Sequence, residues 1–373
     1  MLARILVNFV ITLSFSALFC APKPASNPEV SLDLQEFVRL IADLSEPEGY
    51  FDSDNFVSNE GAYLKILPDL KRQGISGGAY IGVGPDQNYS YIAQIKPQIA
   101  FLIDIRRHNA LEHLYFKALF QLSFNRLQYL ERLFGKNLKG PVQAPQNCSI
   151  SELLRFVDAS SSDKAFAEKK LLEAIQVIRS WDGRLNEADY ESIRFVAQAF
   201  MAQGPDLKFT SFNRPPRSQY PSYRQLLEET DSEGTQANYL ATEENFLLIK
   251  KLHRENRIIP IVGDLGGSYA LAHTGDELRR RKIALTCFYV SNVEFYLFRG
   301  TRWDSYIGNL SNLPRAQNAL LIRSYANFGR LSAQPSSGYY METTIQSIQQ
   351  FLAQESAGQN NSYWNLIPHS PQR

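Results

Sequence analysis

The stretch GGAYIGVGPDQN at residues 77–88 decides the fold of this chain. It predicts a short apolar strand at Tyr80–Val83, a tight turn at Gly84 and then a helix. A second apolar run, Ile99–Ile105, carries Asp104 near its end. Asp104 follows Gly84 by about 20 residues, which is the spacing expected of an acid that accepts hydrogen bonds from ribose hydroxyls. The stretch therefore predicts the first half of a nucleotide-binding α/β unit.

Three later apolar runs, Ile258–Val262, Lys282–Val290 and Ala319–Arg323, extend the predicted sheet. Continuous apolar runs are typical of parallel strands that are covered on both faces. We therefore expect an α/β fold with a doubly wound, mostly parallel sheet and a helical insertion.

The chain divides into five predicted parts, which differ in their pattern of apolar residues. They are a signal peptide or N-terminal anchor (1–25), the first part of the α/β core with N-terminal helices (29–137), a mostly helical insertion (138–240), the second part of the core (241–353) and a loose tail (354–373).

The N-terminus has the pattern of a secretory signal. Met1–Arg4 carries one positive charge, and the apolar run Ile5–Phe19 is short for a membrane-spanning helix, which needs about 20 residues. Cys20 follows this run at the position of a lipoprotein cysteine, although bulky Phe19 precedes it. Export or membrane tethering is therefore expected, with a lipid at Cys20 or an uncleaved anchor as alternatives. Membrane contact is expected only through this segment.

Composition narrows the classes of partner. The formal net charge of +1 gives no indication of nucleic acid or an anionic membrane as partner. The nucleotide-binding pattern of the glycine turn instead favours a small-molecule ligand. Cys148 and Cys287 allow one disulfide, and Cys287 lies in a strand-like run that favours a buried thiol. The histidines lack metal-ligand spacing and no HExxH or CxxC occurs, so no metal site is predicted. The sequence also lacks a P-loop and a GxSxG elbow.

Glycine or polar residues follow four predicted strands: Gly82 and Gly84, Asp104, Asp264, and Asn292 with Glu294. Ligands of doubly wound sheets bind beyond the carboxyl ends of the strands. Each residue also has a structural interpretation: the glycines can serve the turn alone, Asp104 can pair with a neighbouring arginine, and the others can cap helices or close loops.

The order of these elements resembles the S-adenosylmethionine-dependent methyltransferase fold. The resemblance implies that Gly82, Gly84, Asp86, Asp104 and Asp264 bind S-adenosylmethionine. It also implies that the end of the fourth strand faces the acceptor, with Asn292 and Glu294 as candidate catalytic residues. The chain departs from the usual pattern because no acid precedes Gly82 by two residues. The fourth strand also lacks an Asn/Asp-Pro-Pro-aromatic signature.

From about Phe51 to Tyr340 the chain also resembles an uncharacterised bacterial protein family, through FDSDNFVSNE, the glycine-turn region and IIPIVGDLGG. This resemblance brings no established activity. It adds Asn55 and Glu60 as candidate pocket residues.

The sequence is compatible with three functions. The first is methyl transfer from S-adenosylmethionine to an unknown acceptor. Because that cofactor is made in the cytoplasm, the signal sequence favours a second one, an exported or tethered non-catalytic binding protein that uses the same pocket. A dinucleotide-dependent oxidoreductase is the third, and the missing third glycine of GxGxxG argues against it.

Overall fold

The computed structural model describes residues 30–138, 148–161, 163–181, 183–326 and 339–367. These residues form an α/β fold around one six-stranded sheet with the order β3-β2-β1-β4-β5-β6. The strands are β1 (Ala79–Gly82), β2 (Ile99–Asp104), β3 (Ile258–Val262), β4 (Leu285–Ser291), β5 (Arg315–Ala326) and β6 (Met341–Ser347). All four strand pairs among β1 to β5 are parallel, and only the pair of β5 with β6 is antiparallel, which confirms the mostly parallel sheet in the part of the chain that the structure describes.

The register of the parallel strands brings their carboxyl ends to one edge. Gly82 lies beside Leu102 of β2 and Tyr289 of β4, and Asp104 lies beside Val262 of β3. All residues of β1, β2 and β3 are buried, as expected for strands covered on both faces.

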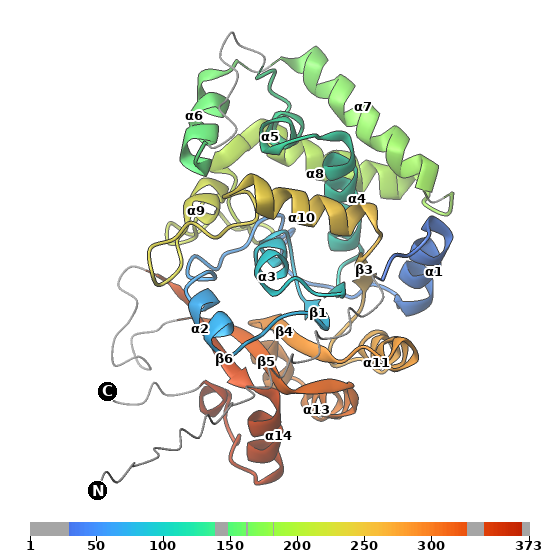
Figure 1. The fold of residues 1–373 in the computed structure, drawn as a ribbon, viewed down its shortest axis with the longest axis vertical. Helices are drawn as coiled ribbons and strands as arrows, with labels where there is room; N and C mark the ends of the chain where they lie inside the picture. Colours follow the sequence, from blue (N-terminus) through green and yellow to red (C-terminus); the bar gives the residue numbers. More distant parts are fainter. Residues whose placement is uncertain (1–29, 139–147, 162, 182, 327–338, 368–373) are drawn as a thin grey trace, which may run out of the picture.

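Helices cover both faces of the sheet (Figure 1). On one side lie α3 (Gln87–Ile95), α4 (Arg107–Leu122) and α10 (Glu243–Arg254). On the other lie α11 (Ala270–Arg281), α13 (Trp303–Asn312) and α14 (Ile348–Ser356). Three further helices are α1 (Leu34–Leu44), which contacts β3, α2 (Leu67–Arg72), and α12 (Val293–Arg299), which follows β4.

The region 138–240, expected to be a mostly helical insertion, contains α6 (Ile150–Ala159), α7 (Lys164–Trp181), α8 (Glu187–Gln203), η1 (Gly204–Asp206) and α9 (Tyr223–Glu228). The helix α5 (Arg126–Phe134) comes before it and connects it to α4. Figure 1 shows α5 to α8 stacked beyond α4, and α7 and α8 both contact α4. One continuous cluster of buried apolar residues includes both Ile81 of β1 and Ile193 of α8, so the insertion shares the core of the sheet.

The structure corrects several details of the predicted elements. The apolar pattern of residues 110–134 predicts one long helix, but the structure has two, because Ser123 ends α4 in an extended conformation and the Asn125 side chain caps α5. The apolar spacing from Tyr63 to Leu70 predicts a longer helix that is kinked or broken at Pro68, but Pro68 lies in the first turn of the short helix α2.

The C-terminal region holds two further corrections. The antiparallel strand β6 was not predicted. The tail expected to be loose from 354 contains η2 (Tyr363–Leu366), where Leu366 is buried.

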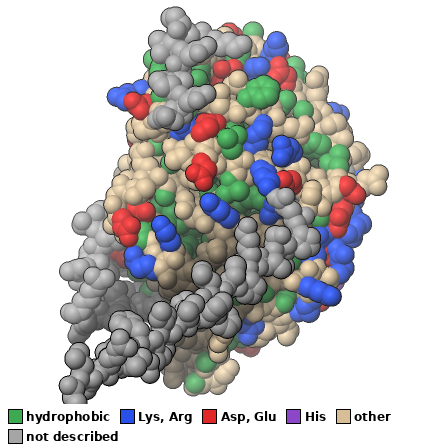
Figure 2. Space-filling model, viewed as in Figure 1, with side chains coloured by type: hydrophobic (Ala, Val, Ile, Leu, Met, Phe, Trp, Pro, Cys, Tyr) green, Lys and Arg blue, Asp and Glu red, His purple; other side chains and the backbone are tan. Residues whose placement is uncertain are grey.

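The predicted signal or anchor, residues 1–25, lies outside the described residues. Among the residues that are described, none of the helices is both long and apolar enough to span a bilayer. On the face seen in Figure 2, Lys and Arg side chains are interspersed with Asp and Glu, which agrees with the net charge of +1.

Candidate functional site

A cavity of about 940 Å³ lies at the carboxyl ends of the parallel strands. Four strands each contribute one predicted site residue to its lining, at or just after their carboxyl end. These residues are Gly84 after β1, Asp104 of β2, Asp264 after β3 and Asn292 after β4. The strand order reverses between β1 and β4, and ligands of doubly wound sheets bind at such a switch point. The four strand ends that the sequence singled out therefore meet at one cavity.

The glycine turn after β1 is held by Asn88. Its side-chain amide donates to the carbonyl oxygens of Val83 (2.9 Å) and Pro85 (2.8 Å), and its Oδ1 accepts from the Tyr80 hydroxyl (2.7 Å). Gly84 has a φ of 84° and lines the cavity.

Gly82 has a different role from Gly84. A Cβ atom built on Gly82 would lie 2.0 Å from Asn88 Oδ1, and Gly82 does not line the cavity. Gly82 therefore permits close packing of the turn, whereas Gly84 exposes backbone to the cavity.

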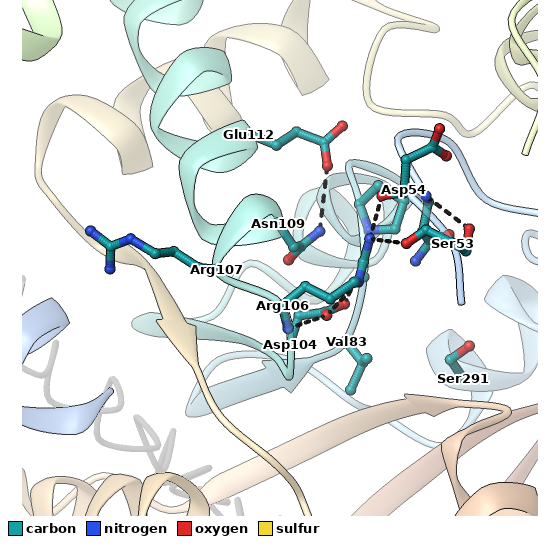
Figure 3. A network of polar contacts seen from close by, with 12 residues as sticks. Ser53, Asp54, Val83, Asp104, Arg106, Arg107, Asn109, Glu112 and Ser291 are labelled. Atoms are coloured by element: carbon teal, nitrogen blue, oxygen red, sulfur yellow. Dashed lines mark hydrogen bonds and ion pairs between the residues drawn. The ribbon is translucent and has the colours of Figure 1, made fainter. Parts of the chain in front are cut away.

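Asp104 forms a buried, bidentate ion pair with Arg106 (Figure 3). The guanidinium donates from Nε to Oδ1 (2.9 Å) and from Nη2 to Oδ2 (2.8 Å), and the Arg106 backbone amide also donates to Oδ1 (3.0 Å). Nη1 of Arg106 binds the carbonyl oxygen of Asp54, so the same side chain ties β2 to the segment 51–54. Arg107 points away from this network and pairs with Asp189 of α8.

Asp264 also lines the cavity with its carboxylate engaged. Oδ1 accepts from the Gly266 backbone amide (2.8 Å), which is the local turn expected of an aspartate before glycine, and Oδ2 pairs with Arg302. The Asp264 amide donates to Glu46 Oε1 (2.6 Å).

The end of β4 places two polar residues on the cavity. Ser291 has a φ of 53°, a left-handed conformation that is uncommon for serine. Its hydroxyl donates to Glu60 Oε1. The Asn292 side chain is half-buried beside it, with Oδ1 3.5 Å from the Ser291 hydroxyl.

Glu60 is a buried carboxylate in the wall of the cavity. It accepts hydrogen bonds from the hydroxyls of Tyr289, Ser291 and Ser324, the last at 2.6 Å. Burial raises the pKa of Glu60, and the three hydroxyl donors offset part of this rise. Asn55, with a φ of 50°, lines the same wall, so both candidates from the segment FDSDNFVSNE lie at the cavity.

Besides Gly82, two predicted site residues, Asp86 and Glu294, do not line the cavity. Asp86 is buried beneath the turn and accepts from the hydroxyls of Tyr223 (2.5 Å) and Tyr239 (2.7 Å). Glu294 is buried in α12, pairs with Arg323 and accepts from Tyr306 (2.8 Å). The structure thus gives both carboxylates internal partners, which corrects their predicted positions in the ligand pocket.

The residue patterns of the sequence did not predict the aromatic and basic part of the cavity. We call it the aromatic rim and define it by the lining residues Phe209, Tyr220, Phe295, Tyr296, Tyr340 and Tyr363. Arg214 and Arg217 line the cavity beside it. Both arginines lie in the segment FNRPPRSQYPSY, the only sequence feature that pointed to this part of the cavity. Its composition indicates a loop but not a binding site.

Cys148 and Cys287 are both buried and free. No group of three or more His, Cys, Asp or Glu side chains is placed to hold a metal ion in the part of the chain that the structure describes.

A family model described as a domain of unknown function (DUF7790) matches residues 55–143 and 164–368, which include most of the cavity wall. No curated protein matches the chain.

Proposed function

The chain belongs to the DUF7790 family, and from its cavity we propose that it is an S-adenosylmethionine-dependent methyltransferase with an unidentified acceptor. One observation carries the proposal. The ends of β1 to β4 contribute Gly84, Asp104, Asp264 and Asn292 to one cavity at the switch point of the sheet. The methyltransferase resemblance of the sequence implies the same four positions in the same order.

The residues present fit the cofactor. Gly84 has no side chain, and a Cβ there would meet no atom nearer than 3.6 Å, so a ligand can approach the backbone of the turn. A carboxylate has about four acceptor positions, and Arg106 uses two on Oδ1 of Asp104 and one on Oδ2. One position on Oδ2 remains for a ribose hydroxyl. Asp264 lies at the third strand, beside the place that the resemblance gives to adenine.

The residues of this chain would act mainly by positioning. S-adenosylmethionine supplies an electrophilic methyl group when it is bound, and transfer requires an acceptor held in line with that group. The Asn292 amide is the polar side chain at the end of β4 that can orient an acceptor. Glu294, our predicted base, lies off the cavity, so Glu60 is the carboxylate placed to take up a proton.

A second candidate function is a non-catalytic binding protein that is exported or membrane-tethered through its N-terminal segment. The ion pairs favour it, because Asp104 and Asp264 each already hold an arginine, Arg106 and Arg302. In this case the cavity takes a polar ligand and no group is transferred.

Calorimetry on the full chain tests the proposal. S-adenosylmethionine and its demethylated product should both bind, and NAD should not. Asp104→Asn should weaken both because it removes a charged ribose acceptor, whereas the exposed control Asp304→Asn should leave both unchanged. Absence of binding by both sulfur compounds would contradict the methyltransferase proposal and favour the second candidate.

A further inference from the structure

The aromatic rim consists of rings that come from distant parts of the chain and line the same cavity. Tyr220 of the insertion lies 5.2 Å from Phe209 and 6.1 Å from Tyr340, between ring centroids. Phe295 of α12 lies 5.4 Å from Tyr296 and 5.1 Å from Tyr363 of η2. Such a wall suits a planar, apolar ligand body.

Four arginines line the cavity: Arg106, Arg214, Arg217 and Arg302. Three of them hold a carboxylate, since Arg106 pairs with Asp104, Arg214 with Asp52, and Arg302 with Asp264. Arg217 differs from the other three. Among the described residues no carboxylate lies within 4.0 Å of it, and its Nη1 donates to the Tyr340 hydroxyl at 3.1 Å. Its guanidinium therefore keeps donors and a full positive charge for a ligand.

The loop that carries Arg217 is fastened to the wall of the cavity. The Thr210 hydroxyl donates to Asp54 (2.9 Å), and the Phe212 amide donates to the Asp52 carbonyl oxygen (3.3 Å). The Tyr220 amide donates to the Arg217 carbonyl oxygen (3.1 Å), and the guanidinium carbon lies 5.9 Å from the Tyr220 ring. Arg217 is thus held beside the aromatic rim as part of the site.

We propose that the aromatic rim and Arg217 form a subsite for a planar aromatic compound that carries one acidic group, with the acid on Arg217 and the ring against the rim. The assignment of this compound as the methyl acceptor rests on the proposed function. The subsite adjoins the end of β4, because Phe295 and Tyr296 lie in the first turn of α12, which begins directly after Asn292.

Binding of a matched pair of probes tests the subsite. 1-Naphthoate and 1-naphthamide share a ring system, but only the first carries a negative charge at pH 7. Calorimetry on the full chain should give at least about tenfold tighter binding of naphthoate, because a hydrogen bond to a charged group exceeds one to a neutral group. Arg217→Gln should remove this preference and leave naphthamide binding unchanged. Arg155→Gln, on the exposed face of α6, is the matched control and should change neither.

Equal binding of the two probes, failure of naphthoate to bind at millimolar concentration, or unchanged naphthoate binding in Arg217→Gln would each overturn the subsite. Titration with demethylated S-adenosylmethionine in the same samples separates the two proposals. Arg217-dependent naphthoate binding without cofactor binding supports the subsite and contradicts only the methyltransferase proposal. Cofactor binding without naphthoate binding contradicts only the subsite.

Discussion

Arg106 holds the Asp104 carboxylate with two parallel hydrogen bonds, Nε to Oδ1 at 2.9 Å and Nη2 to Oδ2 at 2.8 Å. The side chains of both residues are buried, with 8% and 6% of their surface exposed. The charge of the Asp104 carboxylate is therefore balanced by an arginine two residues later in the chain. A ligand at this end of β2 contacts an ion pair with no net charge.

This pair should couple strongly in a double-mutant cycle. Arg106→Gln leaves a buried carboxylate without its cation, and we expect it to lower the free energy of unfolding by about 3–5 kcal/mol. Asp104→Asn should also destabilise, and the double variant should lose less than the sum of the two. Urea unfolding of the four proteins measures the coupling.

The exposed pair Arg39–Asp43 on α1 provides the matched cycle, with Arg39→Gln and Asp43→Asn. Its coupling should be at most about 1 kcal/mol because solvent screens it. A coupling at Asp104–Arg106 no larger than this would contradict a buried, structurally important pair.

Gly82→Ala should destabilise the turn after β1 by about 1–3 kcal/mol. The new methyl group would lie 2.0 Å from Asn88 Oδ1 and 2.7 Å from the Tyr80 ring, so the Asn88 side chain must move. That side chain fixes the carbonyls of Val83 and Pro85. Thermal unfolding measures the loss.

Gly308→Ala is the control for the preceding substitution. Gly308 lies in α13 with no atom within 4 Å of a built Cβ, so alanine there should stabilise by roughly 0.5–1 kcal/mol. Equal effects of the two substitutions would contradict the packing role of Gly82.

The positions that the sequence predicted well are those set by local pattern. Buried apolar runs predicted β1 to β4 because parallel strands covered on both faces leave that pattern, and the strand ends then followed from the register. The strand β6 was not predicted because its sequence METTIQS is largely polar, and after its first two residues it is only half-buried at the edge of the sheet.

Long-range pairing could not be predicted in the same way. Glu294 stands close to the end of β4 in sequence, but Arg323 of β5 and Tyr306 of α13 draw its carboxylate into the interior. Tyr363 reaches the cavity from a segment whose polar composition indicated a loose tail. Such contacts depend on tertiary packing, which residue spacing does not encode.

Asp86 should make stability depend on pH. Burial raises its pKa from 3.8 to about 6, although the Tyr223 and Tyr239 hydroxyls oppose the rise. Because the folded-state pKa lies above the unfolded value, the folded state binds the proton more tightly, and this stabilisation is lost as pH rises from about 4 through about 6. The loss amounts to about 3 kcal/mol, at roughly 1.4 kcal/mol per pH unit.

Urea unfolding between pH 4 and pH 7 tests this dependence. Glu60 and Glu112 also have pKa values raised by burial, so the informative quantity is the difference between wild type and Asp86→Asn. That variant should remove the Asp86 part of the pH slope. The exposed Asp304→Asn should keep the wild-type slope, and an unchanged slope in Asp86→Asn would refute the prediction.

Ser291, at the end of β4, should tolerate glycine better than alanine. Both substitutions lose the hydroxyl that donates to Glu60. Only alanine retains a Cβ atom, and with it the steric cost of the left-handed conformation at φ 53°. We therefore expect Ser291→Ala to be less stable than Ser291→Gly by about 1 kcal/mol in urea unfolding.

Ser123 gives the opposite order and so serves as the control. It is buried with an ordinary φ of −110°, where glycine only adds freedom to the unfolded chain. Ser123→Gly should therefore be less stable than Ser123→Ala. If alanine and glycine ranked the same way at both serines, the strain would not lie at Ser291. If the stability rankings of the two variants are opposite at Ser291 and Ser123, the backbone strain lies at Ser291, in the cavity wall between Glu60 and Asn292. A fixed backbone at this position would orient an acceptor.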